Sequence, residues 1–270
     1  MKKKRLNLTL LIPRYENMFS TFYTMEIIRE ISRQAIEQDV DLLIETAWKA
    51  SPGRGILFAD IMGNESSIKR ARKEKIPYFI LNYYDPASKN NCIGIDNEKA
   101  AFIAVEYLIK SGHSRIATLT GKMNAQAGVM RLEGFKNALK AAGIAPDKKY
   151  IVSGDWSKES GSSAMKKLLS LRKLPSAVFV AGDEMALGAM EAAKQAGLNI
   201  PEDISFVGFD NIPQADSPGV SLTTIEQPFA DLARLGLKYL SDIIKKKPKQ
   251  PVKVILTNIK LVKRNSVREL

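Results

Sequence analysis

The sequence contains one cysteine and one histidine in 270 residues. The single cysteine, Cys92, excludes an internal disulfide, which is typical of proteins from a reducing compartment. Without clustered cysteines or histidines we expect no metal site. The histidine, His113, lies in "SGHSRIATLT" between an expected helix and an expected strand. No cysteine or serine motif accompanies it, so we expect it to fix a turn and not to act in catalysis.

Long apolar runs and catalytic motifs are also missing. No run approaches the ~20 apolar residues of a membrane span. The first apolar stretch, Leu6 to Ile12, is too short and too polar for a secretory signal. The segment "TGKMNAQAG" lacks the spacing of a phosphate-binding loop, and serine-hydrolase and zinc-protease motifs do not occur. We therefore expect a cytoplasmic protein with no membrane partner, no cofactor and no catalytic residue, which is not an enzyme.

Positive charge is in excess, with 41 Lys and Arg residues against 29 Asp and Glu residues and a net charge of +12. This balance suggests a nucleic-acid surface. The lysines are scattered, however, apart from Lys2–Lys4 and Lys245–Lys249, and no aromatic residues interleave with arginines. Solvated helix faces therefore explain the charge better. We expect this chain by itself to bind DNA weakly and without sequence preference.

Short apolar runs alternate with longer amphipathic stretches along the chain. Two of these stretches predict helices: Glu98–Lys110, followed by Gly112, and Asp183–Ala196, opened by Asp183 as N-cap and closed by Gly197. Such alternation predicts an α/β protein whose parallel sheets have helices on both faces, and the length permits two sheets. The expected strands are Leu8–Ile12, Val40–Ile44, Gly55–Phe58, Tyr78–Leu81, Ile116–Leu119, Ala177–Val180 and Ser205–Phe209.

One connection does not follow this alternation. The runs Val40–Ile44 and Gly55–Phe58 are separated by only "ETAWKASPGR". A crossover between parallel strands normally needs a dozen or more residues and usually a helix. Either the topology is unusual here, or a helix has been deleted or left out. We favour the missing helix, because the alternation is regular elsewhere.

Polar and aromatic residues follow several of the expected strands. Asn82 follows "YFIL", Arg131 lies beyond "IATLTG", Trp156 follows "IVSGD" and Asp210 follows "ISFVGF". In open α/β sheets, ligands bind outside the carboxyl ends of the strands. Carboxylate and guanidinium groups bind paired hydroxyls, and an indole face covers an apolar ring. The spacing alone is equally compatible with a turn-capping role for Asp210 and Asn211.

Several motifs resemble the effector-binding core of the lactose- and galactose-repressor family from about Leu8 to Ser266. They are "SGHSRIATLTG", "RLEGFKNAL", "SGDWSKESG", "PSAVFVAGDEMALGAM", "GLNIPEDISFVGFDN", "SLTTIEQP" and "LVKRNS". The resemblance implies a two-lobed periplasmic-binding-protein-like fold of type I, each lobe a parallel sheet flanked by helices. The implied lobes are residues 6–95 with 228–257 and residues 96–227 with 258–270. The crossing segments would fall near Asp96, Thr224–Gln227 and Asn258.

The resemblance also implies a set of effector-binding residues. Asp210 resembles the aspartate that binds effector hydroxyls or ring nitrogens, Arg131 the arginine opposite it, and Trp156 the aromatic that stacks on the ligand. Asn82 falls where sugar-binding members often have aspartate. Tyr23 matches the first of an early aromatic pair. Thr24 replaces the second member of that pair. Gln227 and Phe229 fall on positions at the edge of the family's cleft. Gly182, Ala125 and Ala127 also depart from the family pattern, which leaves the effector unidentified.

The implied function is that of a transcriptional regulator's sensing core. It would bind a small effector, a sugar or related metabolite, between the lobes and act as a homodimer on operator DNA. The DNA contact would come from a headpiece missing from this chain, because "MKKKRLNLTLLIP" begins where the linker of that headpiece would end. A sugar-binding protein of a transport system is the first alternative, and the lack of a signal peptide argues against it. A sugar-modifying enzyme is the second, but Asp210 is the only carboxylate in the strand-end set.

Overall fold

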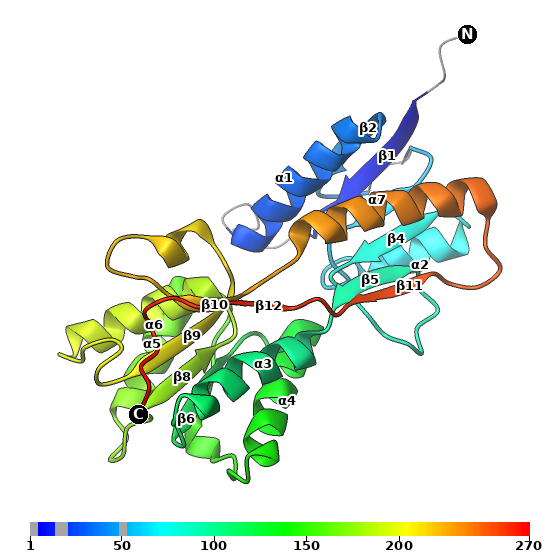
Figure 1. Cartoon of the computed structure of the whole chain (residues 1–270). Helices are drawn as coiled ribbons and strands as arrows, with labels where there is room; N and C mark the ends of the chain where they lie inside the picture. The colour runs from blue at the N-terminus through cyan, green and yellow to red at the C-terminus, as the bar shows by residue number, and fades with distance from the viewer. Residues whose placement is uncertain (1–4, 14–20, 49–52) are drawn as a thin grey trace. The chain divides into compact units, whose positions relative to one another are not determined.

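The structure, a computed structural model, describes residues 5–13, 21–48 and 53–270. The chain divides into two compact units, and Figure 1 shows the elements of each. Unit 1 extends to Ile95 and includes Pro228–Leu256, and unit 2 comprises Asp96–Gln227 and Thr257–Leu270. Each unit is a six-stranded sheet with helices packed against it, which is the periplasmic-binding-protein-like α/β fold expected from the sequence.

Unit 1 contains a parallel sheet with the strand order β11-β5-β4-β3-β1-β2. In the described residues, its helices are α1 (Phe22–Glu37), α2 (Glu65–Lys73) and α7 (Phe229–Lys246). The central strands are continuous apolar runs because both of their faces are buried. The strands are β1 (Leu6–Leu11), β2 (Val40–Glu45), β3 (Ile56–Phe58), β4 (Tyr78–Leu81), β5 (Cys92–Ile95) and β11 (Lys253–Leu256).

The two faces of this sheet pack against different helices. Ile56 and Phe58 of β3 share a buried cluster with Ile68 of α2. On the other face, a Cβ at Gly236 of α7 would lie 2.5 Å from the Leu81 side chain and 3.5 Å from that of Leu57. This glycine therefore lets α7 approach β4 closely. The packing fixes the carboxyl ends of β3 and β4, which hold the unit 1 residues considered below.

The short connection between β2 and β3 crosses from one side of β1 to the other, because β2 and β3 both pair with β1 in parallel. Residues 46–48 and 53–55 are not helical, and residues 49–52 lie outside the described part. The described part of this connection therefore contains no crossover helix, in line with the interpretation that this helix is missing. Leu43 and Ile44 of β2 remain 51% and 39% exposed. The outer edge of the sheet is accordingly less covered than its centre.

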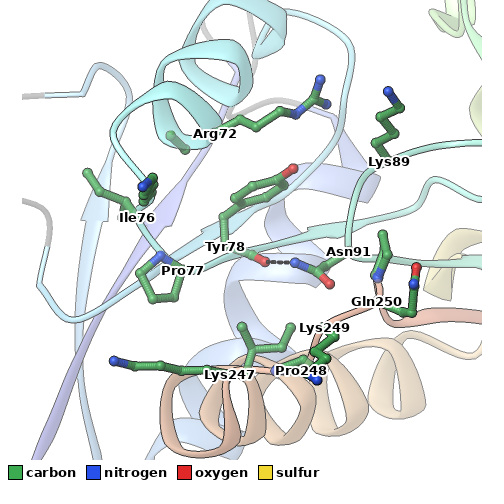
Figure 2. A pocket seen from close by; sticks show the side chains of 14 residues that line it. Arg72, Ile76, Pro77, Tyr78, Lys89, Asn91, Lys247, Pro248, Lys249 and Gln250 are labelled. Atoms are coloured by element: carbon green, nitrogen blue, oxygen red, sulfur yellow. Dashed lines mark hydrogen bonds between the residues drawn. The ribbon is translucent and has the colours of Figure 1, made fainter.

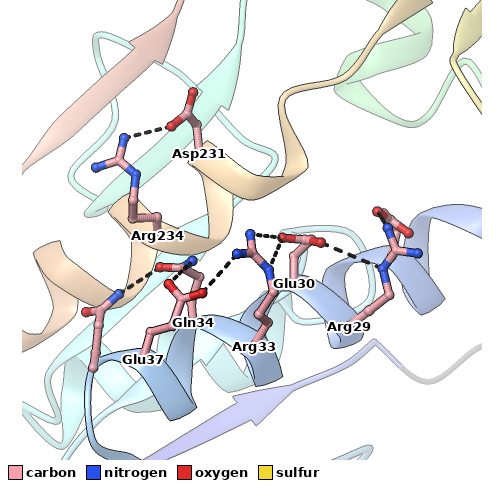
Figure 3. Close-up of polar contacts among 9 residues, drawn as sticks. Arg29, Glu30, Arg33, Gln34, Glu37, Asp231 and Arg234 are labelled. Atoms are coloured by element: carbon pink, nitrogen blue, oxygen red, sulfur yellow. Dashed lines mark hydrogen bonds and ion pairs between the residues drawn. The ribbon is translucent and has the colours of Figure 1, made fainter.

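Helices α1 and α7 carry charges that pair within each helix, and the arginines of these pairs are about half exposed. Arg33 of α1 contacts Glu30 at 2.6 Å and Glu37 at 2.9 Å, and Arg234 of α7 contacts Asp231 at 2.7 Å (Figure 3). Hydrogen bonding and attraction from Glu30 raise the pKa of Arg33. Pairs at this spacing contribute about 0.2–0.5 kcal/mol each. They are consistent with solvated helix faces, and the Lys2–Lys4 cluster lies outside the described residues.

Unit 2 contains the second sheet, with the strand order β12-β10-β9-β8-β6-β7 and only β12 antiparallel to its neighbour. Its strands are β6 (Ile116–Thr120), β7 (Ile151–Ser153), β8 (Ala177–Val180), β9 (Ser205–Asp210), β10 (Thr223–Glu226) and β12 (Lys260–Val262). Its helices are α3 (Asn97–Lys110), α4 (Gln126–Ala141), α5 (Lys158–Leu169) and α6 (Asp183–Gln195), with short 3-10 turns η2 (Lys148–Tyr150) and η3 (Pro213–Asp216).

The two helices expected from the sequence are confirmed as α3 and α6, and Gly112 and Gly197 follow them with φ of 93° and 84°. The expectation that Asp183 caps α6 is wrong. Gly182 occupies the cap position, and Asp183 is the first helical residue. Its carboxylate accepts hydrogen bonds from other elements of unit 2, as described below. A buried carboxylate needs such partners more than a solvated helix end needs a cap.

His113 fixes a turn, as expected. It is 1% exposed, with Nδ1 3.0 Å from Ser176 Oγ and Nε2 3.2 Å from the Arg268 carbonyl oxygen. Burial lowers the pKa of His113, which favours the neutral imidazole. The side chain thus ties the turn after α3 to the C-terminal segment. In the described parts of the chain, none of the helices combines the length and the apolar character that a membrane crossing requires.

Candidate functional site

Asp210 is the last residue of β9 and begins a sharply bent turn. Its φ is 124° and that of Asn211 is 60°, values that cost a non-glycine residue about 1–3 kcal/mol. Asn211 is held by Glu226, to which its amide donates at 2.9 Å, and by Arg264, which donates to its Oδ1 at 2.8 Å. Asn211 therefore has the turn-fixing role. The Asp210 side chain is 19% exposed and is available for another purpose.

Asp183 holds this turn from below. It is fully buried, and its Oδ2 accepts the Ile212 backbone N–H at 3.0 Å while its Oδ1 accepts the Thr224 hydroxyl at 2.7 Å. A Cβ at Gly208 would lie 2.1 Å from Asp183 Oδ1, so only glycine fits beneath this carboxylate. The sequence "DEMALG" therefore supplies an anchor for the turn after β9.

Arg131 of α4 lies 4% exposed at the same end of the sheet. Its Nε donates to Asn97 Oδ1 at 2.8 Å, and its Nη1 donates to the Ala181 carbonyl oxygen that follows β8. Gly134, one turn further along α4, makes this reach possible, because a Cβ there would lie 2.2 Å from the Glu98 carbonyl oxygen of α3. The guanidinium is therefore fixed in position before any ligand arrives.

The Arg131 guanidinium and the Asp210 carboxylate form a buried pair with a long contact of 3.8 Å between Nη1 and Oδ1. The guanidinium carbon also lies 3.4 Å from the centre of the Phe209 ring. Burial lowers the pKa of Arg131 to about 10, although Asp210 and Asp183 oppose this change. Arg131 thus stays charged at neutral pH. In the described part of the chain, no residue accepts a hydrogen bond from its Nη2.

Gln227 completes the polar surroundings of Asp210. Its Nε2 donates to Asp210 Oδ1 at 2.5 Å, and its own Oε1 is buried without a partner in the described residues. Burial raises the pKa of Asp210, whereas Arg131 and the Gln227 amide lower it. Burial and the charge of Asp210 raise the pKa of Asp183. Two carboxylates thus share one guanidinium, and this cluster retains unused donors and acceptors.

Trp156 supplies an aromatic face beside this cluster. It follows β7 with φ of 81°, and its ring lies across Gly121, where a Cβ would be 1.8 Å from a ring carbon. A Cβ at Gly182 would lie 3.6 Å from the same ring and 3.5 Å from Asp210 Oδ2. The Arg131 guanidinium carbon is 5.5 Å from the ring centre. Glycines after β6 and β8 therefore make room for the indole between the strand ends and Asp210.

The remaining three predicted site residues lie in unit 1. The Tyr23 hydroxyl donates to the Ala59 carbonyl oxygen at 2.5 Å, and its ring centre is 5.8 Å from that of Phe229. Asn82 follows β4 with φ of 54°, and its Nδ2 donates to Asp60 Oδ2 at 2.9 Å. The Asn82 Oδ1 atom is buried without a partner in the described residues.

Asp60, which follows β3, is a further partly buried carboxylate that the sequence pattern did not indicate. Burial raises the pKa of Asp60 to about 6, although hydrogen bonds from the Met62 backbone N–H and the Asn82 amide lower it. The carboxylate therefore lies at the carboxyl edge of the unit 1 sheet, beside Asn82 and one residue after the partner of Tyr23.

The structure thus brings four predicted residues together in unit 2 (Asp210, Arg131, Trp156 and Gln227) and three in unit 1 (Tyr23, Asn82 and Phe229). It adds Asp183, Asn97 and Asp60, which support or neighbour these residues. Of these three residues, Asp183 is the one that the sequence could have indicated, because an acid beside a buried strand end needs a partner. In the described residues, His, Cys, Asp and Glu side chains are not grouped to hold a metal ion. The unit 2 cluster offers charged hydrogen-bonding groups and a ring face, which suit a polar small molecule.

Both the sequence and the structure of this chain are similar to those of known proteins. Residues 105–267 match the model of the periplasmic binding protein-like domain. The chain is similar to catabolite control protein A of Priestia megaterium, with 31% identity over 256 residues, covering 90% of this chain and 76% of that protein.

Two further similarities are informative. The HTH-type transcriptional repressor CytR of Escherichia coli is 42% identical over 166 residues, which cover 62% of this chain and about half, 49%, of CytR. A LacI family transcriptional regulator from Enterococcus faecium with bound ribose has a similar structure, with a TM-score of 0.85 and 25% identity. That match covers 98% of this chain and 99% of the Enterococcus faecium chain.

Proposed function

This chain belongs to the LacI family of transcriptional regulators as an effector-binding core, and we propose that it binds its effector at Asp210, Arg131, Trp156 and Gln227. The observation that carries the proposal is the buried pair of Asp210 and Arg131, whose 3.8 Å contact leaves both groups incompletely satisfied. Holding two such charges in place is costly, and losing one partner costs about 3–5 kcal/mol. A ligand hydroxyl that bonds both groups would offset that cost.

The chemistry of this site favours a sugar or a related hydroxylated metabolite. Asp210 accepts hydrogen bonds, the Nη2 group of Arg131 donates them, and Gln227 Oε1 is an unused acceptor. The Trp156 ring provides a flat apolar face for the ring of a sugar or nucleoside. Ribose in the Enterococcus faecium regulator supports this ligand class.

Unit 1 carries effector-binding residues of its own in this proposal. Tyr23, Asn82 and Phe229 lie at or beside the carboxyl edge of its sheet, which is where ligands bind in open α/β folds. The buried Asn82 Oδ1, without a partner in the described residues, is the group most in need of one. A ligand hydroxyl would satisfy it.

The effector signal is proposed to act on operator DNA. The relatives are transcriptional regulators, and CytR is an HTH-type repressor. We infer that the regulator works in the cytoplasm as a homodimer, and that effector and operator each change the affinity for the other by the same factor. Sedimentation of the purified chain tests the dimer, and a gel-shift assay of the regulator with and without effector tests the coupling.

Calorimetry with a panel of sugars, sugar phosphates and nucleosides tests the site itself. Asp210→Asn keeps the shape of the side chain and removes the charge, so we expect affinity for a binding panel member to fall about tenfold or more. Asp231→Asn, on the exposed face of α7, is the control and should bind as the wild type does. Equal affinity of the wild type and Asp210→Asn for the same ligand would show that the site lies elsewhere.

A further inference from the structure

Unit 1 has a cavity of about 510 Å³ at the amino edge of its sheet. Its floor is where β4 and β5 begin, and its walls come from the ends of α2 and α7 and from the segment before β11 (Figure 2). Asp60 and Asn82 follow the opposite, carboxyl ends of β3 and β4. The cavity is therefore separate from the unit 1 residues of the proposed effector site. Its volume falls within the range of small-molecule sites, about 300–1,000 Å³.

The cavity is lined by five cationic side chains and by no carboxylate: Arg72, Lys75, Lys89, Lys247 and Lys249. Within the described residues, none of these five forms an ion pair. Nearby lysines do form them, since Lys238 and Lys246 of α7 both contact Asp242 at 3.2 Å. Five uncompensated positive charges around one concave surface attract a polyanion.

Arg72 is the cation that the structure holds in place. One of its Nη2 hydrogens donates to Asn90 Oδ1, which also accepts the Tyr78 hydroxyl at 2.9 Å. Asn90 and Tyr78 are 7% and 6% exposed, so this support is buried. The other guanidinium N–H groups have no partner in the described part of the chain. A guanidinium presented in this way matches two oxygens of a phosphate group.

Hydrogen bonds and prolines hold parts of the cavity wall in place. The Asn91 side chain is bonded at both ends, since its Nδ2 donates to the Tyr78 carbonyl oxygen at 3.2 Å and its Oδ1 accepts the Val252 N–H at 2.9 Å. Three prolines line the space as well: Pro77, Pro248 and Pro251. A preformed wall lowers the entropy cost of binding.

Helix dipoles do not account for the charge. Lysines near the ends of α2 and α7 also stabilise those helices, because each helix C-terminus carries about half a negative charge. Two helix ends together neutralise about one positive charge of the five. An excess of about four charges remains. A phosphate monoester carries about 1.5–2 negative charges at neutral pH, so one phosphate group neutralises at most about half of this excess.

We propose that this cavity binds a small organic polyphosphate, a molecule with at least two phosphate groups. Arg72 binds one phosphate through two N–H groups, and the lysines bind the others. The cavity is separate from the residues of the proposed effector site, so this ligand would bind in addition to the effector. This inference does not depend on the identity of the effector.

Calorimetry with pyrophosphate, ATP and AMP as probes tests the proposal. We expect ATP and pyrophosphate to bind the wild type at least about tenfold more tightly than AMP, because more phosphate oxygens meet cations. The double variant Lys247→Glu/Lys249→Glu should lose at least about tenfold in affinity for ATP. The control is Lys166→Glu/Lys167→Glu, which makes the same charge change at exposed positions of α5 and should keep the wild-type affinity.

Three outcomes would overturn the proposal. Equal losses in both double variants would mean that the overall charge of the chain attracts the probes. AMP binding as tightly as ATP would remove the polyphosphate requirement. The third outcome concerns a duplex oligonucleotide that displaces ATP and binds the wild type more tightly than ATP does. If this oligonucleotide lost affinity only in Lys247→Glu/Lys249→Glu, the cavity would be a DNA contact. Arg72→Lys separates charge from geometry, because it keeps the charge and should still bind ATP several-fold more weakly than the wild type.

Discussion

Replacing Asp183 tests how the turn that carries Asp210 is held. Asp183→Ala removes the acceptors of the Ile212 N–H and the Thr224 hydroxyl. Asp183→Asn keeps both contacts, since the amide oxygen accepts the Ile212 N–H and the amide nitrogen donates to the Thr224 hydroxyl oxygen. Both substitutions remove the repulsion between the two carboxylates. The difference between the two variants therefore isolates the hydrogen bonds.

The structure sets the size of this difference. Both contacts are buried, and leaving a buried donor unsatisfied costs about 1–3 kcal/mol. For two groups, of which the hydroxyl can turn to another partner, we expect Asp183→Ala to be about 2–4 kcal/mol less stable than Asp183→Asn. Asp183→Asn itself should be at least as stable as the wild type at pH 8, because burial and Asp210 raise the pKa of Asp183 and penalise its charged form.

Urea unfolding followed by tryptophan fluorescence measures these stabilities. The chain has two tryptophans, Trp48 in unit 1 and Trp156 in unit 2. In a Trp48→Phe background, the emission reports on unit 2. Effector affinity should follow the same order, with Asp183→Asn near the wild type and Asp183→Ala weaker by tenfold or more, on the order of the cost of a misplaced charged hydrogen bond. A stability difference of less than about 0.5 kcal/mol between the variants would refute the anchoring role of Asp183.

Two further substitutions test the other parts of the proposed site. The pKa of Asp60 in the folded chain, about 6, lies above the ordinary value of 3.8. Folding therefore favours the neutral carboxyl group, and the stability of unit 1 should fall as the pH rises from 4 to 7. Asp60→Asn should remove this fall in stability of about 1–3 kcal/mol. Urea unfolding at pH 4.5 and 7 in a Trp156→Phe background measures it, and an unchanged dependence of stability on pH would contradict the prediction. Gly121→Ala places a methyl group 1.8 Å from the Trp156 ring, so the ring should move. The emission maximum of Trp156 should then shift, and effector affinity should fall about tenfold. Wild-type emission and affinity in this variant would show that Trp156 does not need its present position.

Much of the fold could be predicted because its strands are continuous apolar runs. The seven expected strands all occur, with ends within about two residues. Six of them are buried on both faces over most of their length, whereas β2 is an edge strand with partly exposed side chains. Five strands were not predicted: β5, β7, β10, β11 and β12. β5 and β10 are buried, but Gly94 interrupts the apolar pattern of one and two threonines begin the other. β7 and β11 have partly exposed side chains throughout, and β12 pairs antiparallel at a sheet edge. Edge strands contribute little apolar area, so their pattern resembles that of a loop.

The unit 2 site could be predicted in part for a different reason. Asp210 ends the buried strand β9, Arg131 lies in the helix that follows the buried strand β6, and Trp156 follows the partly exposed edge strand β7. Parallel strands bring their carboxyl ends to one edge of the sheet. Asn97 gave no such signal, since it begins α3 and contacts Arg131 only because Gly134 lets two helices approach. Asp183 was assigned as a cap because its position before an apolar helix is ambiguous. Its actual partners, Thr224 and Ile212, are about 30–40 residues away in sequence and depend on the register of β9 and β10.

The strand next to β4 carries a carboxylate close to Asn82, the position where sugar-binding members of the family often have aspartate. The resemblance to the family suggested that a carboxylate is often found at this position, and its absence left the ligand class open. In the structure, Asp60 places a carboxylate 2.9 Å from the Asn82 amide, at the end of β3 instead of β4. Adjacent parallel strands lie about 4.8 Å apart, so moving the acid across one strand keeps it at the same edge. We propose that a ligand at this edge would meet an amide oxygen and a carboxylate together, and that this pair, not either residue alone, would set which hydroxyl groups unit 1 accepts.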